Sequence, residues 1–219
     1  MLNSKNNIAL VTGASRGLGY QVAKLLGEKG LHVVGLARTV GGLETLSDDI
    51  KKANGSSTMV PINLESDVDL DELAVAISKR WKRIDIFIHC ACIASPMSPV
   101  TSTSMKDFEN LFKLNVKITL KLIQIIDPLL KLSTVKKAIF LDDRHAGKFL
   151  SLYAASKAAS REIVAAYKEE SKRIGPKVIT FNPKPMPTGL RARFYPGEDK
   201  NELESCLSQA KELIEKAKL

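Results

Sequence analysis

Short apolar runs alternate with longer stretches of helical periodicity along the chain, and this alternation constrains the fold more than any other feature. The runs are nearly continuous in apolar character, as in strands that are buried on both faces. Strands that alternate with helices predict an α/β fold, a doubly wound parallel sheet with helices on both faces. The expected strands cover residues 8–12, 33–37, 58–63, 84–90, 137–142 and 177–182.

The expected helices lie between these strands. In the first, Leu18, Val22, Leu25 and Leu26 recur at helical spacing, and Gly30 ends the helix. No linker, repeat or low-complexity tract divides the chain, so we expect a single dinucleotide-binding domain over residues 1–219, in which 189–219 form a substrate loop and a C-terminal helix. The remaining helices are expected at 43–53, 69–81, 105–130, 152–173 and 201–218.

Composition excludes several classes of protein. A chain of 219 residues with 44% hydrophobic residues can bury a core without disulfides or metal. No apolar run approaches the roughly 20 residues of a membrane-spanning helix. The net charge of +9 comes from scattered lysines, which favours a solvated basic surface over nucleic-acid binding. The polar segment Met1–Asn7 and the odd count of three cysteines favour a cytoplasmic protein.

A glycine-rich turn connects the first strand to the first helix. Glycines at this place allow a tight turn and let the backbone approach a phosphate closely, while the helix N-terminus supplies unpaired N–H groups. The turn therefore predicts a dinucleotide site, although a plain strand–helix turn is the alternative. The residues expected to bind the cofactor here are Gly13, Ser15, Arg16, Gly17, Leu18 and Gly19.

The end of the second strand indicates which dinucleotide binds. Ala37 has no carboxylate for the ribose hydroxyls of NAD, whereas Arg38 can pair with a 2′-phosphate. Arg16 in the glycine turn can add a second cation. We therefore expect NADP(H) to be preferred over NAD(H), the alternative being that both arginines are only solvated.

Tyr153 and Lys157 lie four residues apart at the start of an expected helix, so they share one face. A phenol is a poor base at neutral pH, but a nearby ammonium group lowers its pKa. Tyr153 can then exchange a proton with a carbonyl or alcohol oxygen, as in general acid–base catalysis. Without the glycine turn upstream, the pair would be interpreted as an ordinary surface contact.

Taken together, these motifs resemble the short-chain dehydrogenase/reductase family, whose fingerprint TGxxxGxG matches Thr12–Gly19. The resemblance spans about residues 6–190 and includes the YxxxK pair and Asn115; residues 191–199 look like the tail of an uncharacterised bacterial oxidoreductase branch. It implies a Rossmann-like fold and hydride transfer between NADP(H) and a carbonyl or secondary alcohol. It also implies that Lys157 binds the nicotinamide ribose and that Asn115 holds the helix geometry and a proton-relaying water.

The resemblance implies further contacts with the cofactor. Asn63, in place of the family's usual Asp, and Leu64 would lie near the adenine, and Met186 and Thr188 near the nicotinamide carboxamide. The stretch 189–199 would be the mobile substrate loop, in which Arg191, Arg193 and Tyr195 face either an acidic substrate or solvent. The other positions implied to bind the cofactor are Cys90, Ala91, Cys92, Tyr153, Lys157 and Pro183.

The chain departs from the family at the catalytic serine, where Asp143 is the most plausible occupant and Ser151 lies too close to Tyr153 to replace it. Losing one oxyanion donor costs about 10²–10³ in rate. An ionised Asp143 costs more and raises the pKa of Tyr153, whereas a protonated one can still donate. A slow enzyme is therefore expected, and a catalytically idle NADP(H)-binding sensor or scaffold is the alternative.

Other departures concern the neighbouring loops and the C-terminus. His89-Cys90-Ala91-Cys92 replaces Asn-Asn-Ala-Gly, so Cys92 can crowd the cofactor; small buried thiols are favoured there over a metal site. Lys184 replaces a glycine and either binds an anion or points to solvent. The usual seventh strand is missing, which leaves the sixth strand exposed or covered by the last helix or a partner subunit. A homodimer through 105–130 and 152–173 is expected.

Overall fold

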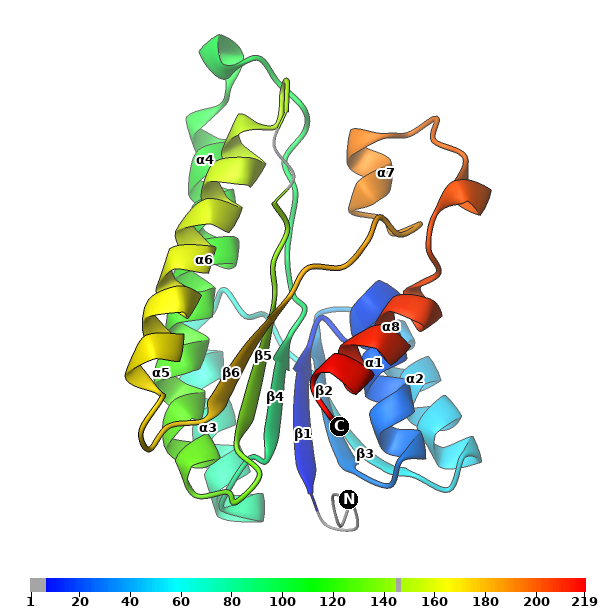
Figure 1. Cartoon of the computed structure of the whole chain (residues 1–219), viewed down its shortest axis with the longest axis vertical. Helices are drawn as coiled ribbons and strands as arrows, with labels where there is room; N and C mark the ends of the chain where they lie inside the picture. Colours follow the sequence, from blue (N-terminus) through cyan, green and yellow to red (C-terminus); the bar gives the residue numbers. More distant parts are fainter. Residues whose placement is uncertain (1–6, 145–146) are drawn as a thin grey trace.

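The computed structural model describes residues 7–144 and 147–219. It contains one parallel sheet with the strand order β3-β2-β1-β4-β5-β6, which confirms the doubly wound, Rossmann-like architecture (Figure 1). The polar segment 1–6 lies outside the described residues. The strands are β1 Ile8–Thr12, β2 His32–Ala37, β3 Ser56–Pro61, β4 Ile86–His89, β5 Lys137–Leu141 and β6 Lys177–Phe181.

Helices cover both faces of this sheet (Figure 1). Because side chains alternate along a strand, neighbouring strand residues enter different cores: Leu10 and Phe87 face one side, Val11 and Ile88 the other. On one side lie α1 Gly17–Glu28, α2 Val40–Lys52 and α8 Cys206–Lys216; on the other lie α3 Asp67–Trp81, α4 Met105–Phe112, α5 Ile118–Lys131 and α6 Ser151–Glu170.

The prediction of a single helix over residues 105–130 is wrong in the middle of that range. The π-helix η2, Lys113–Lys117, separates α4 from α5. Within it, the backbone carbonyl of Asn115 accepts a hydrogen bond from the Thr119 hydroxyl at 2.8 Å. Such a widened turn is frequent at functional sites. This π-helix contains Asn115, one of the candidate site residues of the sequence analysis.

The C-terminal helix is shorter than expected and begins at Cys206, where the Ser205 hydroxyl accepts a hydrogen bond from the Ser208 N–H. Its apolar residues join the core beside α1, so the helix covers a face of the sheet. β6 remains the edge strand among the described residues, as expected without a seventh strand. Among all the described residues, no helix is long and apolar enough to cross a membrane.

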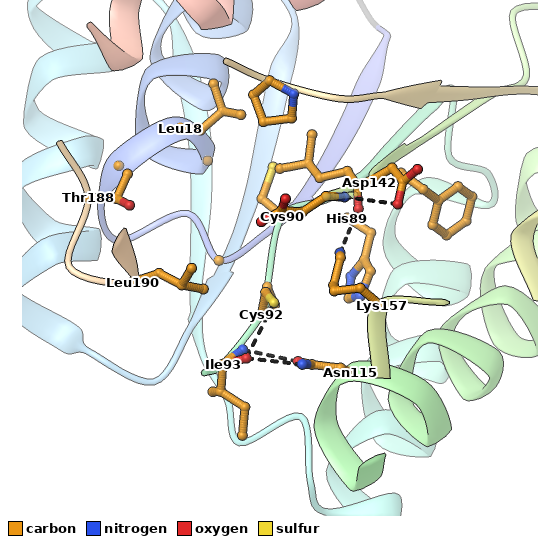
Figure 2. A pocket seen from close by; sticks show the side chains of 18 of the residues that line it. Leu18, His89, Cys90, Cys92, Ile93, Asn115, Asp142, Lys157, Thr188 and Leu190 are labelled. Atoms are coloured by element: carbon orange, nitrogen blue, oxygen red, sulfur yellow. Dashed lines mark hydrogen bonds between the residues drawn. The ribbon is translucent and has the colours of Figure 1, made fainter. Parts of the chain in front are cut away.

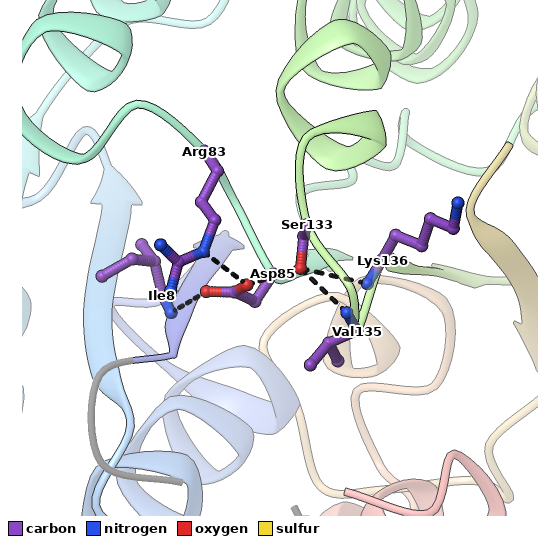
Figure 3. A network of polar contacts seen from close by, with 6 residues as sticks. All are labelled: Ile8, Arg83, Asp85, Ser133, Val135 and Lys136. Atoms are coloured by element: carbon purple, nitrogen blue, oxygen red, sulfur yellow. Dashed lines mark hydrogen bonds and ion pairs between the residues drawn. The ribbon is translucent and has the colours of Figure 1, made fainter. Parts of the chain in front are cut away.

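Asp85 organises the opposite end of the sheet, just before β4 (Figure 3). Its carboxylate is 1% exposed and accepts hydrogen bonds from the Ile8 N–H at 2.7 Å and the Ser133 hydroxyl at 2.5 Å. Arg83 Nε donates to the same carboxylate at 2.9 Å. Asp85 therefore ties the start of β1 to the turn before β5, which aligns the central strands that lead to the cavity.

Replacing Asp85 with Asn removes a buried charge while its donors remain in place. We expect Asp85→Asn to lower the free energy of unfolding by about 3 kcal/mol, because buried donors lose their charged acceptor. Urea denaturation measures this change. The matched control is Asp71→Asn, which breaks an exposed ion pair with Lys121 and should have little effect; equal losses in the two variants would contradict the assignment.

Candidate functional site

A cavity of about 730 Å³ opens at the carboxyl ends of the strands, where the chain order of the sheet reverses (Figure 2). Asn63 does not line it; this side chain is exposed and accepts a hydrogen bond from the Glu65 N–H. The other singled-out residues do line it: Gly13, Ser15, Arg16, Gly17, Leu18, Gly19, Arg38, Leu64, Cys90, Ala91, Cys92, Asn115, Asp143, Tyr153, Lys157, Pro183, Met186 and Thr188.

The glycine turn forms one wall of the cavity. Gly13 and Gly17 have φ values of +68° and +61°, which favour glycine. A Cβ on Gly13 would lie 2.9 Å from the Ala91 nitrogen, whereas one on Gly17 would lie 3.5 Å from the Thr188 methyl group. No side chain caps the N-terminus of α1, so its first N–H groups can bind an anion. The turn therefore fits the phosphates of a dinucleotide.

His89 lies at the base of the cavity between two threonines. The Thr12 hydroxyl accepts hydrogen bonds from the Cys90 and Ala91 N–H groups, so its own hydrogen is directed to His89 Nδ1 at 2.8 Å. His89 Nε2 therefore carries the ring hydrogen and donates it to the Thr119 hydroxyl at 3.2 Å. Burial lowers the pKa of His89 to about 3, with a contribution from the positive charge of Lys157. The ring is consequently neutral at physiological pH.

Asn115 continues this chain of hydrogen bonds toward α6. Its carbonyl accepts from Thr119, and its side chain pairs with the backbone of Ile93 in both directions at 3.0 Å (Figure 2). The Asn115 amide also donates to the Ser156 hydroxyl at 3.0 Å. Asn115 thus fixes the loop after β4 against α6.

Tyr153 and Asp143 meet at the far end of the cavity. The Tyr153 hydroxyl donates to Asp143 Oδ2 at 2.8 Å. Burial raises the pKa of Tyr153 far above its ordinary value, and the neighbouring Cys92 and Asp143 raise it further. The expectation that Lys157 lowers this pKa is wrong for the structure as it stands, because Lys157 Nζ donates to the Leu141 carbonyl at 2.8 Å.

Two successive aspartates follow β5, and only the second approaches Tyr153. Asp142 is buried and accepts from Arg144 Nε at 3.3 Å and lies 3.4 Å from Arg161 Nε. The structure therefore puts Asp143, and not Asp142, beside the tyrosine.

The cysteines of the loop after β4 are half-buried. Burial raises the pKa of Cys90 to about 12 and also raises that of Cys92. Both thiols are therefore protonated at neutral pH and act as small side chains. In the part of the chain that the structure describes, no group of three His, Cys, Asp or Glu side chains is arranged to hold a metal ion.

The segment 189–199, which the sequence predicts to be a substrate loop, contains the one-turn helix α7, Arg191–Phe194, whose cationic side chains have protein partners. Arg191 donates to both carboxylate oxygens of Glu198 at 2.6 and 2.5 Å, and Arg193 donates to the Ala94 carbonyl at 2.7 Å. Lys184, likewise, pairs with Glu204 at 3.3 Å. The sequence left an acidic substrate and solvent as alternatives for these arginines: Arg193 is exposed to solvent, and Arg191 lines the cavity as part of an ion pair.

Sequence reasoning missed the apolar wall of the cavity. Ile93, Leu190 and Phe194 line the end near Tyr153, and the Phe194 ring lies 5.0 Å from the Tyr153 ring. Phe194 is buried although it belongs to a loop segment that is otherwise polar. The adjacent aromatic residues Phe194 and Tyr195 in such a segment are the signal that identifies this wall.

A family model and several known proteins match this chain. A family model described as short chain dehydrogenase matches residues 7–199. The human protein named dehydrogenase/reductase SDR family member 11 is 38% identical over 114 residues, 51% of this chain and 44% of that protein, so the match spans less than half of the relative's length. An uncharacterised oxidoreductase of Staphylococcus aureus (strain N315) is 27% identical over 198 residues, 89% of this chain and 84% of the relative.

Solved structures share the fold. A Pseudomonas syringae protein classed with the short chain dehydrogenases superposes with a TM-score of 0.87 at 30% identity, covering 93% of this chain and 85% of that one. A metagenomic short-chain oxidoreductase in complex with NADP superposes with a TM-score of 0.83 at 20% identity, covering 99% and 92%.

The buried neutral state of His89 predicts a loss of stability in acid. Unfolded His89 binds a proton below pH 6.5, whereas the folded residue resists protonation down to about pH 3, so unfolding takes up protons between these values. We expect the free energy of unfolding to fall by up to about 1.4 kcal/mol per pH unit through His89. Denaturant titrations between about pH 5 and 6.5 should give a smaller slope for His89→Asn than for the unmodified protein; equal slopes would contradict a neutral His89.

Proposed function

The chain belongs to the short-chain dehydrogenase/reductase family, and we propose that it transfers hydride between NADP(H) and a carbonyl or secondary alcohol. One observation carries the proposal: a single cavity joins the glycine turn to Tyr153 and Lys157. When bound there, the nicotinamide supplies the hydride. The chain's own residues bind and orient the dinucleotide, exclude water and hold the proton.

The phosphates of the cofactor would bind at the glycine turn, where the first N–H groups of α1 are uncapped by side chains. Arg38 is exposed at the end of β2 and lines the cavity, and Arg16 of the glycine turn lines it as well. Guanidinium groups in this cavity suit a 2′-phosphate, which supports NADP(H) over NAD(H). The metagenomic oxidoreductase of similar fold is also described with NADP.

Tyr153 would donate or remove the proton on the reacting oxygen. Its hydroxyl already has a directed hydrogen bond, and Lys157 of the same helix face lines the same cavity. On cofactor binding, Lys157 would exchange the Leu141 carbonyl for the ribose hydroxyls, which would bring a positive charge to bear on the phenol. That charge would counteract the raised pKa of Tyr153 and make proton exchange accessible.

The idle cofactor-binding relative is the second candidate, and the contact between Tyr153 and Asp143 favours it. In this contact the acidic hydrogen of Tyr153 is directed to a carboxylate rather than to a substrate. Hydride transfer to a carbonyl builds negative charge beside that carboxylate, which slows the reaction. The two candidates share the cofactor and differ in turnover.

The proposal extends to assembly and location. A homodimer through α4, α5 and α6 is supported by the exposed apolar residues Met105, Phe108 and Leu120. A reducing cytoplasm is supported by the three free thiols.

Arg38→Ala tests the preference for the phosphorylated cofactor. We expect the dissociation constant of NADPH to rise about tenfold or more, because a charge-assisted hydrogen bond is lost, while that of NADH changes little. Calorimetric titration of both nucleotides measures the ratio. Arg173→Ala removes the same charge from an exposed site outside the cavity and should change neither constant; an unchanged NADPH constant in Arg38→Ala would contradict the role of Arg38.

Tyr153→Phe tests the proton donor. We expect turnover of aldehydes and ketones to fall by about 10²–10⁴ while NADPH affinity is unchanged, because only the hydroxyl is removed. Tyr167→Phe is the matched control, since the Tyr167 hydroxyl bonds Asp127 outside the cavity. If the unmodified protein binds NADPH tightly but shows no turnover, the idle candidate is supported. If neither the unmodified protein nor Tyr153→Phe binds NADPH, the cofactor site is contradicted.

A further inference from the structure

The reacting end of the cavity presents a carboxylate where carbonyl reduction needs a second donor. The Tyr153 hydroxyl gives its hydrogen to Asp143 Oδ2 at 2.8 Å. An ionised carboxylate only accepts hydrogen bonds, so it cannot stabilise a developing oxyanion. The arrangement instead suits a substrate atom that brings its own hydrogen and a positive charge.

We propose that this site acts on a protonated carbon–nitrogen double bond in preference to a ketone or aldehyde. The proposal rests on the proposed function, in which reduced nicotinamide is the hydride donor beside Tyr153. The N–H of the protonated imine donates to Asp143. Hydride from the nicotinamide then forms the new C–H bond, the π electrons of the C=N bond become the nitrogen lone pair, and a neutral amine and oxidised nicotinamide result.

The charge of Asp143 acts in opposite directions on the two substrate classes. A nearby negative charge favours the protonated imine and raises the pKa of its nitrogen, so that a larger fraction of the imine carries the proton at a given pH. The protonated imine is the form that accepts hydride, so the reactive fraction increases. For a ketone the same charge repels the oxyanion that forms, and a low-dielectric cavity strengthens both effects.

Four of the cationic side chains that line the cavity each have a partner within the protein. Arg191, whose charge interacts with that of Asp143, gives two hydrogen bonds to Glu198 and stacks over Tyr195 at 4.6 Å. Lys157 donates to the Leu141 carbonyl, and Arg144 and Arg161 pair with Asp142. The Asp143 side chain meanwhile lines the cavity itself.

The neighbouring walls specify the rest of the substrate. Ile93, Leu190 and Phe194 line the cavity beside Tyr153, and they belong to or pack against one small apolar cluster. Apolar walls bind alkyl or aryl groups, and a single carboxylate orients one polar atom. The inferred substrate class is therefore an apolar imine, or the corresponding secondary amine in the oxidative direction.

The kinetic test compares two substrates of similar shape, dihydroisoquinoline and tetralone, with the full-length protein and NADPH. We expect kcat/KM for the imine to exceed that for the ketone at least tenfold. Asp143→Ser should reverse this preference, because it restores an oxyanion donor and removes the charge. Asp71→Asn, which removes a carboxylate from an exposed ion pair on α3, should leave the preference unchanged.

A binding test gives a readout that does not depend on turnover. Calorimetry with NADP⁺-loaded protein compares the tetrahydroisoquinolinium cation with neutral tetralol. We expect the cation to bind at least tenfold more tightly, and Asp143→Asn and Asp143→Ser each to abolish the difference. Equal or tighter binding of the alcohol, including no detectable binding of either, would overturn the proposal.

The outcomes separate this inference from the function beneath it. If NADPH binds and tetralone is reduced in preference to the imine, the imine proposal fails and the oxidoreductase remains. If NADPH does not bind, the proposed function itself fails. Cation binding that is lost in the Asp143 variants would support the assignment of substrate class.

Discussion

The reversal of strand order between β1 and β4 is the constraint on which the site depends. β1 pairs with β2 on one side and with β4 on the other, so the connections that follow β1 and β4 lead to opposite faces of the sheet. Because the two connections leave in opposite directions, neither of them covers the space between the carboxyl ends of β1 and β4. The Thr12 hydroxyl bridges its base by accepting from the Cys90 and Ala91 N–H groups. The cavity is thus a consequence of topology, and these hydrogen bonds fix its base.

From that base, a chain of neutral hydrogen bonds extends to α6. It runs from Thr12 through His89 and Thr119 to Asn115, and from the Asn115 side chain to Ser156. Each hydrogen in the chain has one acceptor, so the direction of every hydrogen bond is determined. The π-helix at Asn115 belongs to this chain, because it carries the carbonyl that Thr119 bonds and the side chain that holds Ile93. Strand ends, the widened helix and α6 are therefore positioned as one unit.

Local pattern was enough to predict the sheet, the glycine turn and the Tyr153–Lys157 pair. Apolar periodicity identifies buried strands, glycine spacing identifies the turn, and four-residue spacing puts two side chains on one helix face. The sequence alone does not determine the contact between Tyr153 and Asp143, because this contact depends on how the segment after β5 meets α6. The Arg191–Glu198 pair was missed because it depends on the folding of a loop. The π-helix was missed because its apolar pattern continues through 105–130 without a break.

A crystal structure of the protein with NADP⁺ tests the central claim most directly. The account predicts the pyrophosphate against the Gly13–Gly19 turn, the 2′-phosphate within reach of Arg38, and the nicotinamide ring on the Tyr153 side of the cavity with Lys157 moved from the Leu141 carbonyl to the ribose. A dinucleotide bound elsewhere, or one whose nicotinamide ring points away from Tyr153, would contradict it.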